Sequence, residues 1–145
     1  MSSAVASPAH IRSARQVSAR PPVVPAALAL LTQARRGLAD AERQTAPVER
    51  FTAAYSSALR AAAAVLAARG RPHRGRSRPT SVWTLLPSAA PELGEWATFF
   101  AAHSGLQAAA QAGIAHRISA RTADDLLRQA EQFVDLTFRA TPGAP

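Results

Sequence analysis

The sequence predicts an all-α protein, an up-and-down bundle of four main helices plus a short fifth, preceded by a disordered N-terminal tail. Apolar residues recur at steps of three and four over most of the chain, which is the period of an amphipathic helix. No stretch alternates apolar and polar residues between turn sequences, as a strand would. Proline and glycine leave short connections between most helical segments, and short connections favour antiparallel neighbours.

The first helix is expected over residues 24–43. Prolines stand at its start, and the break Thr45-Ala46-Pro47 follows its end. Residues spaced by three and four positions form one face of this helix. They are Val24, Leu28, Leu31, Arg35 and Leu38.

The second helix, expected over residues 47–69, has the clearest pattern. Pro47 and Glu49 suit a first helical turn, and Gly70 suits the position after the last one. Its apolar stripe is uninterrupted and comprises Phe51, Ala54, Tyr55, Ala58, Leu59, Ala62, Val65 and Leu66.

Two helical segments are expected after an arginine-rich loop at 69–79. Thr80-Ser81 is placed to cap a short helix that carries Val82, Trp83, Leu85 and Leu86. Pro91 is expected to start a longer helix, which has a weak point at Gly105 and ends at Gly113. The expected inner side of the longer helix comprises Leu93, Trp96, Phe99, Phe100, His103 and Leu106.

The last helix is expected over residues 122–139. The sequence Thr122-Ala123-Asp124-Asp125 resembles a capping box with Asp in place of Glu. The stripe of this helix comprises Ala123, Leu126, Leu127, Ala130, Phe133, Val134 and Phe138.

A chain of 145 residues fits one domain, which can bury a core without metal or disulfide support. We expect a disordered basic tail at 1–20, the bundle with its basic loop at 21–140, and a short tail at 141–145. The absence of cysteine excludes disulfides, thiolate nucleophiles and cysteine-based zinc sites. No apolar run reaches the roughly 20 residues of a membrane span. We therefore expect a cytoplasmic protein without a membrane segment.

The net charge of +8 is concentrated in two segments. Residues 1–20 contain three arginines and no acid, and residues 69–78 contain five arginines and no acid. The rest of the chain has nine arginines and nine acids and is formally neutral. Every basic residue is arginine, and lysine and asparagine are absent, which indicates a high-GC bacterial genome rather than selection for phosphate recognition.

The candidate nucleic-acid-binding residues are Arg71, Arg74, Arg76 and Arg78. Clustered arginines bind polyanions by counterion release, weakly and with little sequence preference. The alternative interpretation is a solvated linker that promotes solubility. Aromatic residues, which stack bases in single-strand platforms, are not interleaved with these arginines.

The only candidates for acid–base chemistry at neutral pH are the histidines His10, His73, His103 and His116. No HExxH, P-loop or GxGxxG motif is present, nor a Glu-x-x-His pair of the kind that holds a di-iron centre. We therefore expect no catalytic residue, no metal ligand and no cofactor.

Four segments together resemble the HEPN superfamily (higher eukaryotes and prokaryotes nucleotide-binding domain), in particular a small actinobacterial subfamily. The segments are LLTQARRGLADA (30–41), ERFTAAYSSALRAAAAVLAARGR (49–71), SVWTLLPSAAPELGEWATFFA (81–101) and SARTADDLLRQAEQFVDL (119–136). The resemblance lies in the order and character of the helices and in Trp83 and Trp96. It implies a bundle of four or five helices that often dimerises.

Many members of the superfamily are ribonucleases of toxin–antitoxin or defence systems. Their site is an Arg, four to six residues, then a His, at a dimer interface, where the His can act on a 2′-hydroxyl. No His of this chain has an Arg at that spacing; Arg69 and His73 come one residue too close. Arg128 is followed at that distance by Phe133, Val134 and Asp135. The resemblance therefore supplies no catalytic residue.

Three functions are compatible with the sequence. The first is a non-catalytic binding or assembly module that forms a homodimer and has an RNA or protein partner. The second is binding of RNA or another nucleic acid through the four loop arginines. The third is a metal-independent ribonuclease of toxin–antitoxin type with a rearranged site that uses His73 or His116.

Overall fold

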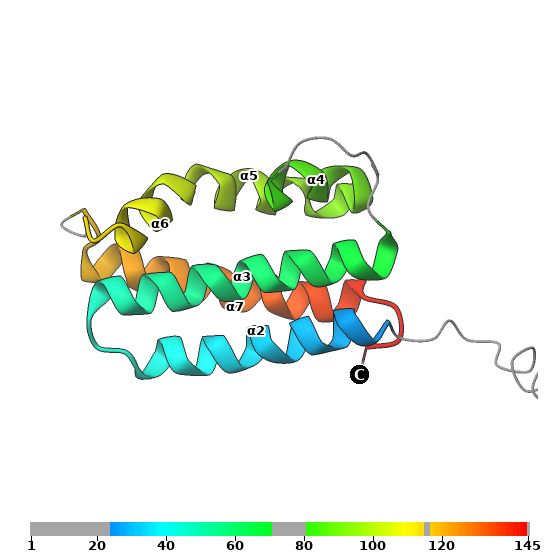
Figure 1. Ribbon diagram of the computed structural model, residues 1–145, viewed down its shortest axis with the longest axis horizontal. Coiled ribbons are helices and arrows are strands. Elements are labelled where there is room, and N and C mark those ends of the chain that lie inside the picture. Colours follow the sequence, from blue (N-terminus) through cyan, green and yellow to red (C-terminus); the bar gives the residue numbers. More distant parts are fainter. Residues whose placement is uncertain (1–23, 71–80, 115–116, 145) are drawn as a thin grey trace, which may run out of the picture.

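The computed structural model describes residues 24–70, 81–114 and 117–144. All regular elements in these ranges are helices, which confirms the predicted all-α class (Figure 1). In chain order they are α2 (Pro25–Arg43), α3 (Pro47–Arg69), α4 (Val82–Ala89), the 3₁₀ turn η1 (Pro91–Leu93), α5 (Gly94–Ala102), α6 (Ser104–Gln111) and α7 (Ala120–Ala140). The predicted tail at 1–20 and most of the predicted loop at 69–79 lie outside the described residues.

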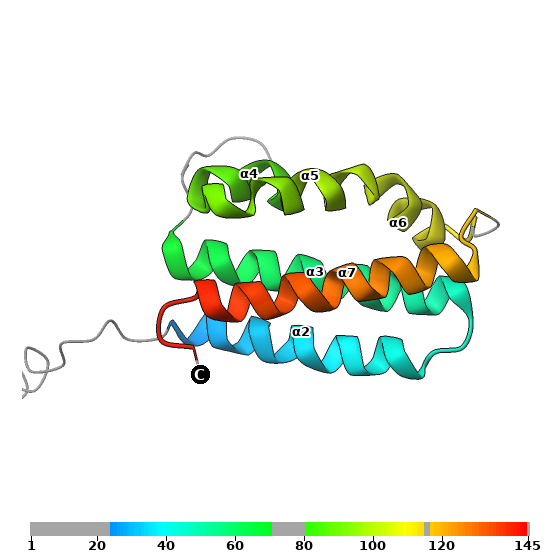
Figure 2. The same cartoon turned by 180° about the vertical axis from the view of Figure 1, so that it is seen from behind.

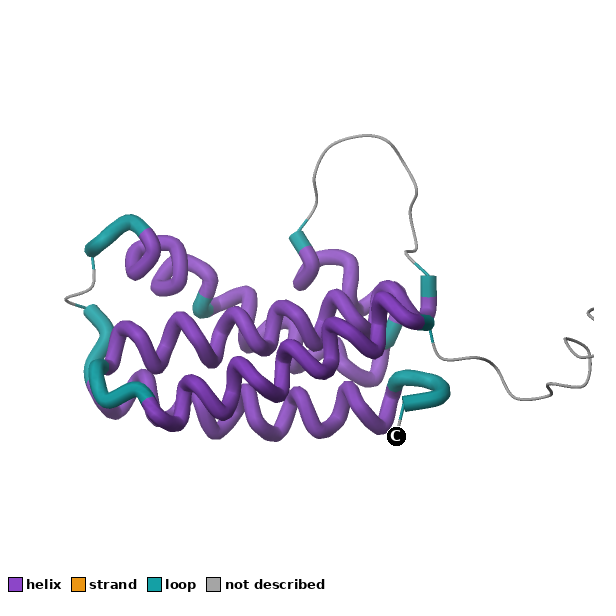
Figure 3. The backbone as a smooth tube through the Cα atoms, turned by 60° about the horizontal axis from the view of Figure 1, so that its bottom comes forward, coloured by secondary structure: helices purple, strands orange, loops and turns teal. Residues whose placement is uncertain are grey.

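The helices form a bundle in which the chain direction alternates. The long helices α2, α3 and α7 pack together, and α4, α5 and α6 follow one another along the far side of α3 and α7 from α2 (Figures 1 and 2). Helix α4 runs parallel to α3, since Trp83 at its start contacts Tyr55 and Ala89 at its end contacts Arg69, the last residue of α3. The chain reverses after α4, so that α5 and α6 run antiparallel to α3 and α7 returns parallel to it (Figures 1 and 3). This is the predicted up-and-down order.

Small residues bring α2 and α3 close together. The buried residues of α2 recur at steps of four and three, and three of the five are alanines that the predicted face left out. At Gly37, a Cβ atom would overlap the hydroxyl of Ser57, a fully buried residue of α3. Arg35, which the prediction placed on the buried face, is exposed. The buried set is Ala27, Leu31, Ala34, Leu38 and Ala41.

Helix α3 is the centre of the bundle. Seven of the eight residues in its predicted stripe are buried, and Leu59 is half-buried. Ser57, Ala61 and Ala64 are buried as well, because α2 and α7 both pack on this helix and α4 contacts its end. By length and composition alone α3 could cross a membrane, but 56% of its most apolar stretch is buried inside the fold. That burial fits the core helix of a soluble protein.

Aromatic side chains fill the space between α3, α7 and the segmented row. Trp83 stacks on Phe100 with ring centres 5.0 Å apart, and Phe133 of α7 lies 5.2 Å from Phe100. The indole nitrogen of Trp83 donates a hydrogen bond to the Tyr55 hydroxyl at 2.9 Å. That hydroxyl in turn donates to the Phe100 carbonyl at 3.0 Å, so both buried polar groups are satisfied. Burial raises the pKa of Tyr55 above its ordinary value.

The predicted single helix that starts at Pro91 is divided. It begins as η1, and His103, with φ −99° and ψ 2°, separates α5 from α6. The break therefore lies two residues before Gly105, which is inside α6. The predicted inner side does face the core, since Trp96, Phe99 and Leu106 pack against it, although these three residues and His103 are only half-buried. The buried positions on these segments are Leu93, Ala97, Phe100 and Gln107.

Two predicted helix starts have different outcomes. Ser81 caps α4, as predicted, by accepting a hydrogen bond from the Trp83 amide at 3.1 Å. The capping box at Thr122 is wrong, because Ser119 caps α7 and accepts from the Thr122 amide at 3.0 Å. Ile118 and Ala123 on either side of this cap are both buried, which is the arrangement of a hydrophobic staple. The apolar pair therefore selects the earlier of two possible caps.

Candidate binding cleft

The predicted nucleic-acid-binding residues Arg71, Arg74, Arg76 and Arg78 lie outside the described residues. The structure does describe the points to which this segment is attached, Gly70 after α3 and Ser81 at the start of α4.

Arg69, which the prediction counted in the basic loop, is the last residue of α3 and has a structural role. Its guanidinium donates to the carbonyls of Ala89 at 3.2 Å and Ala140 at 3.1 Å, at the ends of α4 and α7. It also pairs with Glu92 at 2.6 Å and holds the pKa of that carboxyl below its ordinary value. Its donors therefore bind the end of α3 to two other helices.

His103 is the one histidine in the described ranges, since His10, His73 and His116 lie outside them. Its Nδ1 lies 2.8 Å from the carbonyl of Phe99, one turn earlier in α5. The ring lies 4.5 Å from the Phe99 ring and 6.5 Å from that of Phe51. These contacts place the imidazole at the break between α5 and α6, where it satisfies a carbonyl at the end of a helix.

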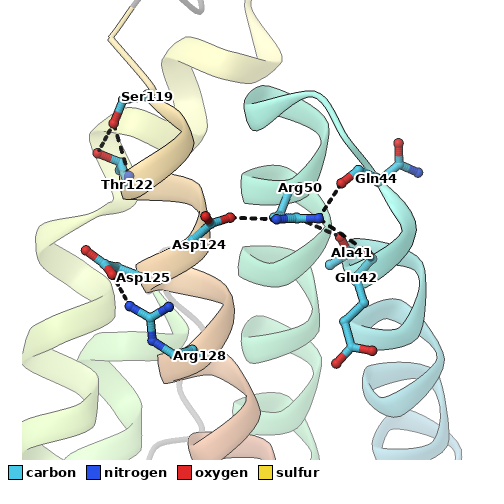
Figure 4. A network of polar contacts seen from close by, with 9 residues as sticks. All are labelled: Ala41, Glu42, Gln44, Arg50, Ser119, Thr122, Asp124, Asp125 and Arg128. Carbon is cyan, nitrogen blue, oxygen red and sulfur yellow. Dashed lines mark hydrogen bonds and ion pairs between the residues drawn. The ribbon is translucent and has the colours of Figure 1, made fainter.

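Arg50 joins three helices (Figure 4). From the first turn of α3 it donates to the carbonyls of Ala41, Glu42 and Gln44 at the end of α2, at 3.1, 3.2 and 2.7 Å. Its other terminal nitrogen pairs with Asp124 of α7 at 2.6 Å. A helix leaves its last four carbonyls without intrahelical partners, and Arg50 supplies several of the missing donors. Arg50 therefore has a structural role.

A cleft of about 590 Å³ lies where the end of α2, the first half of α3 and the end of α6 meet. Small or apolar residues form part of its lining: Gly37, Val48, Ala53 and Ala110. The polar lining residues are Asp40, Gln44, Glu49, Thr52, Ser56, Arg60 and Gln111.

A buried amide adjoins this cleft. Gln107 of α6 is only 5% exposed, and its Nε2 donates to the Ser56 hydroxyl, a lining group, at 3.4 Å. Its Oε1 is the one buried side-chain polar atom in the described ranges that has no hydrogen-bond partner. Leaving a buried acceptor unpaired costs about 1–3 kcal/mol. Gln107 thus supports the Ser56 wall of the cleft from the core side.

The lining is richer in acceptors than in cations. It contains the carboxylates of Asp40 and Glu49 and one guanidinium, that of Arg60. Asp40 also pairs with Arg43 of its own helix, whereas neither Glu49 nor Arg60 has an ion pair among the residues that the structure describes. Ser56 is hydrogen-bonded to an amide rather than to a base, so its hydroxyl is not activated as a nucleophile. This composition suits recognition of a donor-rich or cationic group.

A second acidic site lies between α2 and α7, in a groove of about 250 Å³. A hydrogen bond from Glu42, with burial and the charges of Glu42 and Asp135, raises the pKa of Glu131 to about 7, against the opposing effect of Arg128. No group of three or more metal-ligating side chains occurs in the described ranges. When both are ionised, the carboxylates of Glu42 and Glu131 repel each other across the α2–α7 contact.

Comparison with protein families is decisive for the identity of the fold. A family model described as SAV_6107-like HEPN matches residues 41–137, about two-thirds of the chain. The chain belongs to this HEPN family. The resemblance inferred from the helix pattern is therefore confirmed. No curated protein and no solved structure matches the chain.

The residues matched by the family model include only part of the cleft lining of this HEPN domain. The matched span contains the walls from α3 and α6, including Ser56 and Gln111, together with Gln107 behind them. Gly37 and Asp40 of α2 lie before the matched span. Part of the cleft is thus built by a helix that lies mostly outside the matched segment.

Sequence reasoning missed this cleft. Neither Ser56 nor Gln107 belongs to a sequence motif, and Gln107 lies in an alanine-rich stretch. The available signal was a polar residue at a helical position facing the core, since Gln107 falls in step with Leu93, Ala97 and Phe100. What it would face could not be read from one helix, because the cleft is made by three.

Proposed function

We propose that this HEPN domain is a non-catalytic binding or assembly module that acts in the cytoplasm. The observation that carries the proposal is that the side chains able to take part in catalysis are engaged in structural hydrogen bonds. Arg50 and Arg69 satisfy carbonyls at helix ends, His103 bonds to a carbonyl of α5, and Tyr55 joins two aromatic residues. A side chain whose donors are consumed in this way is poorly placed to activate a substrate.

The cleft between α2, α3 and α6 supports the binding part of the proposal. It is polar, open to solvent and bordered by a buried amide with an unpaired oxygen. A few polar groups placed on a mostly preformed cavity are typical of ligand-binding sites.

Incubation of the full-length chain with mixed RNA, with and without divalent metal, tests the proposal. We expect the RNA to remain intact. Cleavage that copurifies with the protein would overturn the non-catalytic role. If that cleavage were lost in His73→Ala or His116→Ala, the result would favour the rearranged ribonuclease site instead.

RNA binding through Arg71, Arg74, Arg76 and Arg78 is a second candidate. It is favoured by five arginines and no acid in residues 69–78, and by the pairing of Arg69, which fixes the base of this segment on the bundle. Fluorescence anisotropy with labelled single-stranded RNA, at low and near-physiological salt, tests it. Replacement of all four arginines by serine should abolish binding, and the steepness of the salt dependence estimates the number of phosphates contacted.

A matched control separates the position of the charges from their number. Arg36, Arg117, Arg121 and Arg139 are exposed on the bundle, so their replacement by serine removes the same charge. Equal losses in the two quadruple variants would show that only net charge matters and would reject a binding site in the loop.

We also propose that the module is a homodimer, as the HEPN resemblance implies. Half-buried Trp96 and Phe99 border a groove of about 260 Å³ with Glu95 and Gln129, and aromatic side chains are enriched at protein interfaces. Sedimentation that shows only monomer at concentrations on the order of tens of micromolar would reject an obligate dimer.

A further inference from the structure

The cleft between α2, α3 and α6 has features of a site for a cationic, donor-rich group. Asp40 pairs with Arg43, but Glu49 has no ion pair in the described ranges, and the hydroxyl and amide groups of Thr52, Ser56 and Gln111 supply further acceptors. We propose that the N-terminal segment of this same chain, residues 1–20, docks in this cleft through its arginines. The inference rests on the proposed role of the cleft as a binding site and adds its occupant.

The chemistry of the N-terminal segment complements that of the cleft. Residues 1–20 contain Arg12, Arg15 and Arg20 and no acid. A guanidinium has five N–H donors and no acceptor, so it can bond a carboxylate and neighbouring amide or hydroxyl oxygens at once. Glu49, which has no ion pair in the described ranges, is the natural anchor for it.

The number of residues between each arginine and the start of α2 limits which arginines can reach the cleft. Asp40 lies sixteen residues beyond Val24 along α2, a distance of about 24 Å at the helical rise. Arg15 and Arg12 precede Val24 by nine and twelve residues, which span about 30 Å and 40 Å when extended. Arg20 precedes it by four residues and extends about 14 Å, short of Asp40. Docking should therefore use Arg12 and Arg15 but not Arg20.

Docking of this kind has a regulatory consequence. A segment tethered to the same chain acts at a high effective concentration, so it competes with any external ligand of the cleft. A partner would have to displace it, and removal of its arginines would increase the affinity of the cleft for other basic ligands.

Paramagnetic relaxation enhancement on the full-length chain tests the proposal. The chain has no cysteine, so Ser13→Cys provides a unique site for a nitroxide label between the two arginines. We expect the strongest broadening at the backbone amides of Asp40, Ser56 and Gln111. The double variant Arg12→Ser/Arg15→Ser should lower the ratio of docked to undocked chain roughly fivefold, by loss of two ion pairs.

Two variants serve as controls. Arg20→Ser should leave the broadening unchanged, whereas Glu49→Gln should reduce it while preserving the pattern of amide resonances of the folded bundle. Broadening confined to the start of α2, or insensitive to Glu49→Gln, would overturn the proposal. So would broadening that appears only between labelled and unlabelled copies, because it would place the segment in a second molecule. Any of these results would leave the non-catalytic role, tested by RNA stability, untouched.

Discussion

The guanidinium donors of Arg50 and Arg69 are occupied by hydrogen bonds to helix ends. Each donates to main-chain carbonyls at the ends of other helices and also pairs with one carboxylate. Neither role was visible from the sequence, where both residues counted simply as positive charge. The number of arginines in a chain therefore overstates the charge that is available for a ligand.

Arg50→Ala should destabilise the protein by about 3 kcal/mol, because it leaves helix-end carbonyls and a partly buried carboxylate without their donor. Urea unfolding followed by circular dichroism would measure the change. Arg36→Ala is the control, since Arg36 is exposed and such a change should stay within about 0.5 kcal/mol. Equal midpoints for the two variants would contradict the structural role of Arg50.

A pair of glycine substitutions tests the close approach of α2 and α3. Gly37→Ala should destabilise by about 1–3 kcal/mol because its Cβ meets the buried Ser57 hydroxyl. Gly105→Ala has open space around its Cβ inside α6, and it should stabilise by up to about 1 kcal/mol through helix propensity. Thermal melts of the two variants should therefore shift in opposite directions, and a shift in the same direction would contradict the packing described here.

The Glu42–Glu131 pair predicts a pH dependence of stability. The pKa of Glu131 rises from 4.5 to about 7 in the folded protein, through the hydrogen bond with Glu42, burial and the charges of Glu42 and Asp135, with Arg128 opposing. Arg35 also borders this groove. The folded state holds this proton more tightly than the unfolded state does. Its stabilisation is therefore complete below about pH 4.5 and is lost as the pH rises toward 7.

Denaturant unfolding at several pH values between these limits would measure that loss, which we expect to be about 1 kcal/mol once solvent screening is allowed for. Glu131→Gln should remove this component, because the amide cannot ionise and can still bond to Glu42. Glu95→Gln, at an exposed position of α5, should retain it. An unchanged pH profile in Glu131→Gln would show that the pair does not control stability.

At the scale of helices, periodicity predicted the long elements well. The expected ranges 24–43 and 47–69 differ from α2 and α3 by at most one residue, because proline and Gly70 mark their limits. The segmented row was harder, because its buried positions depend on which side of α5 meets α7. Trp96 and Phe99 pack at the edge of the core and stay half-buried, whereas Ala97 and Phe100 are fully enclosed. Periodicity therefore predicted the face that meets the core but not which of its positions would be fully buried.

The start of α7 allows a test at this scale. Ser119→Ala should cost about 1 kcal/mol because it removes the side-chain acceptor for the Thr122 amide. Thr122→Ala should cost less, since the Thr122 hydroxyl only accepts an exposed hydrogen bond from Ser119. Chemical denaturation would rank them. A larger effect at Thr122 would restore the capping box that the sequence suggested.

At the scale of the whole molecule, the family was predictable and the candidate site was not. The order of helices resembles that of HEPN domains, and the match over residues 41–137 confirms it. The cleft depends on how three helices meet, and two of its walls, from Asp40 and Gln111, are 71 positions apart in the chain. The predicted loop arginines stay a prediction, because they lie outside the described residues.

The hydrogen-bonded chain from Trp83 through Tyr55 to Phe100 has an optical consequence. Tyr55 is the single tyrosine of the protein, and its ring lies 6.2 Å from that of Trp83, one of two tryptophans. At that separation, excitation energy absorbed by Tyr55 is transferred efficiently to the indole of Trp83. The emission of this indole indicates that water is excluded from it. The energy transfer from Tyr55 to Trp83 is therefore an intrinsic probe of the junction between α3, α4 and α5. Recovery of tyrosine emission would signal that this junction has opened, even while circular dichroism still records intact helices.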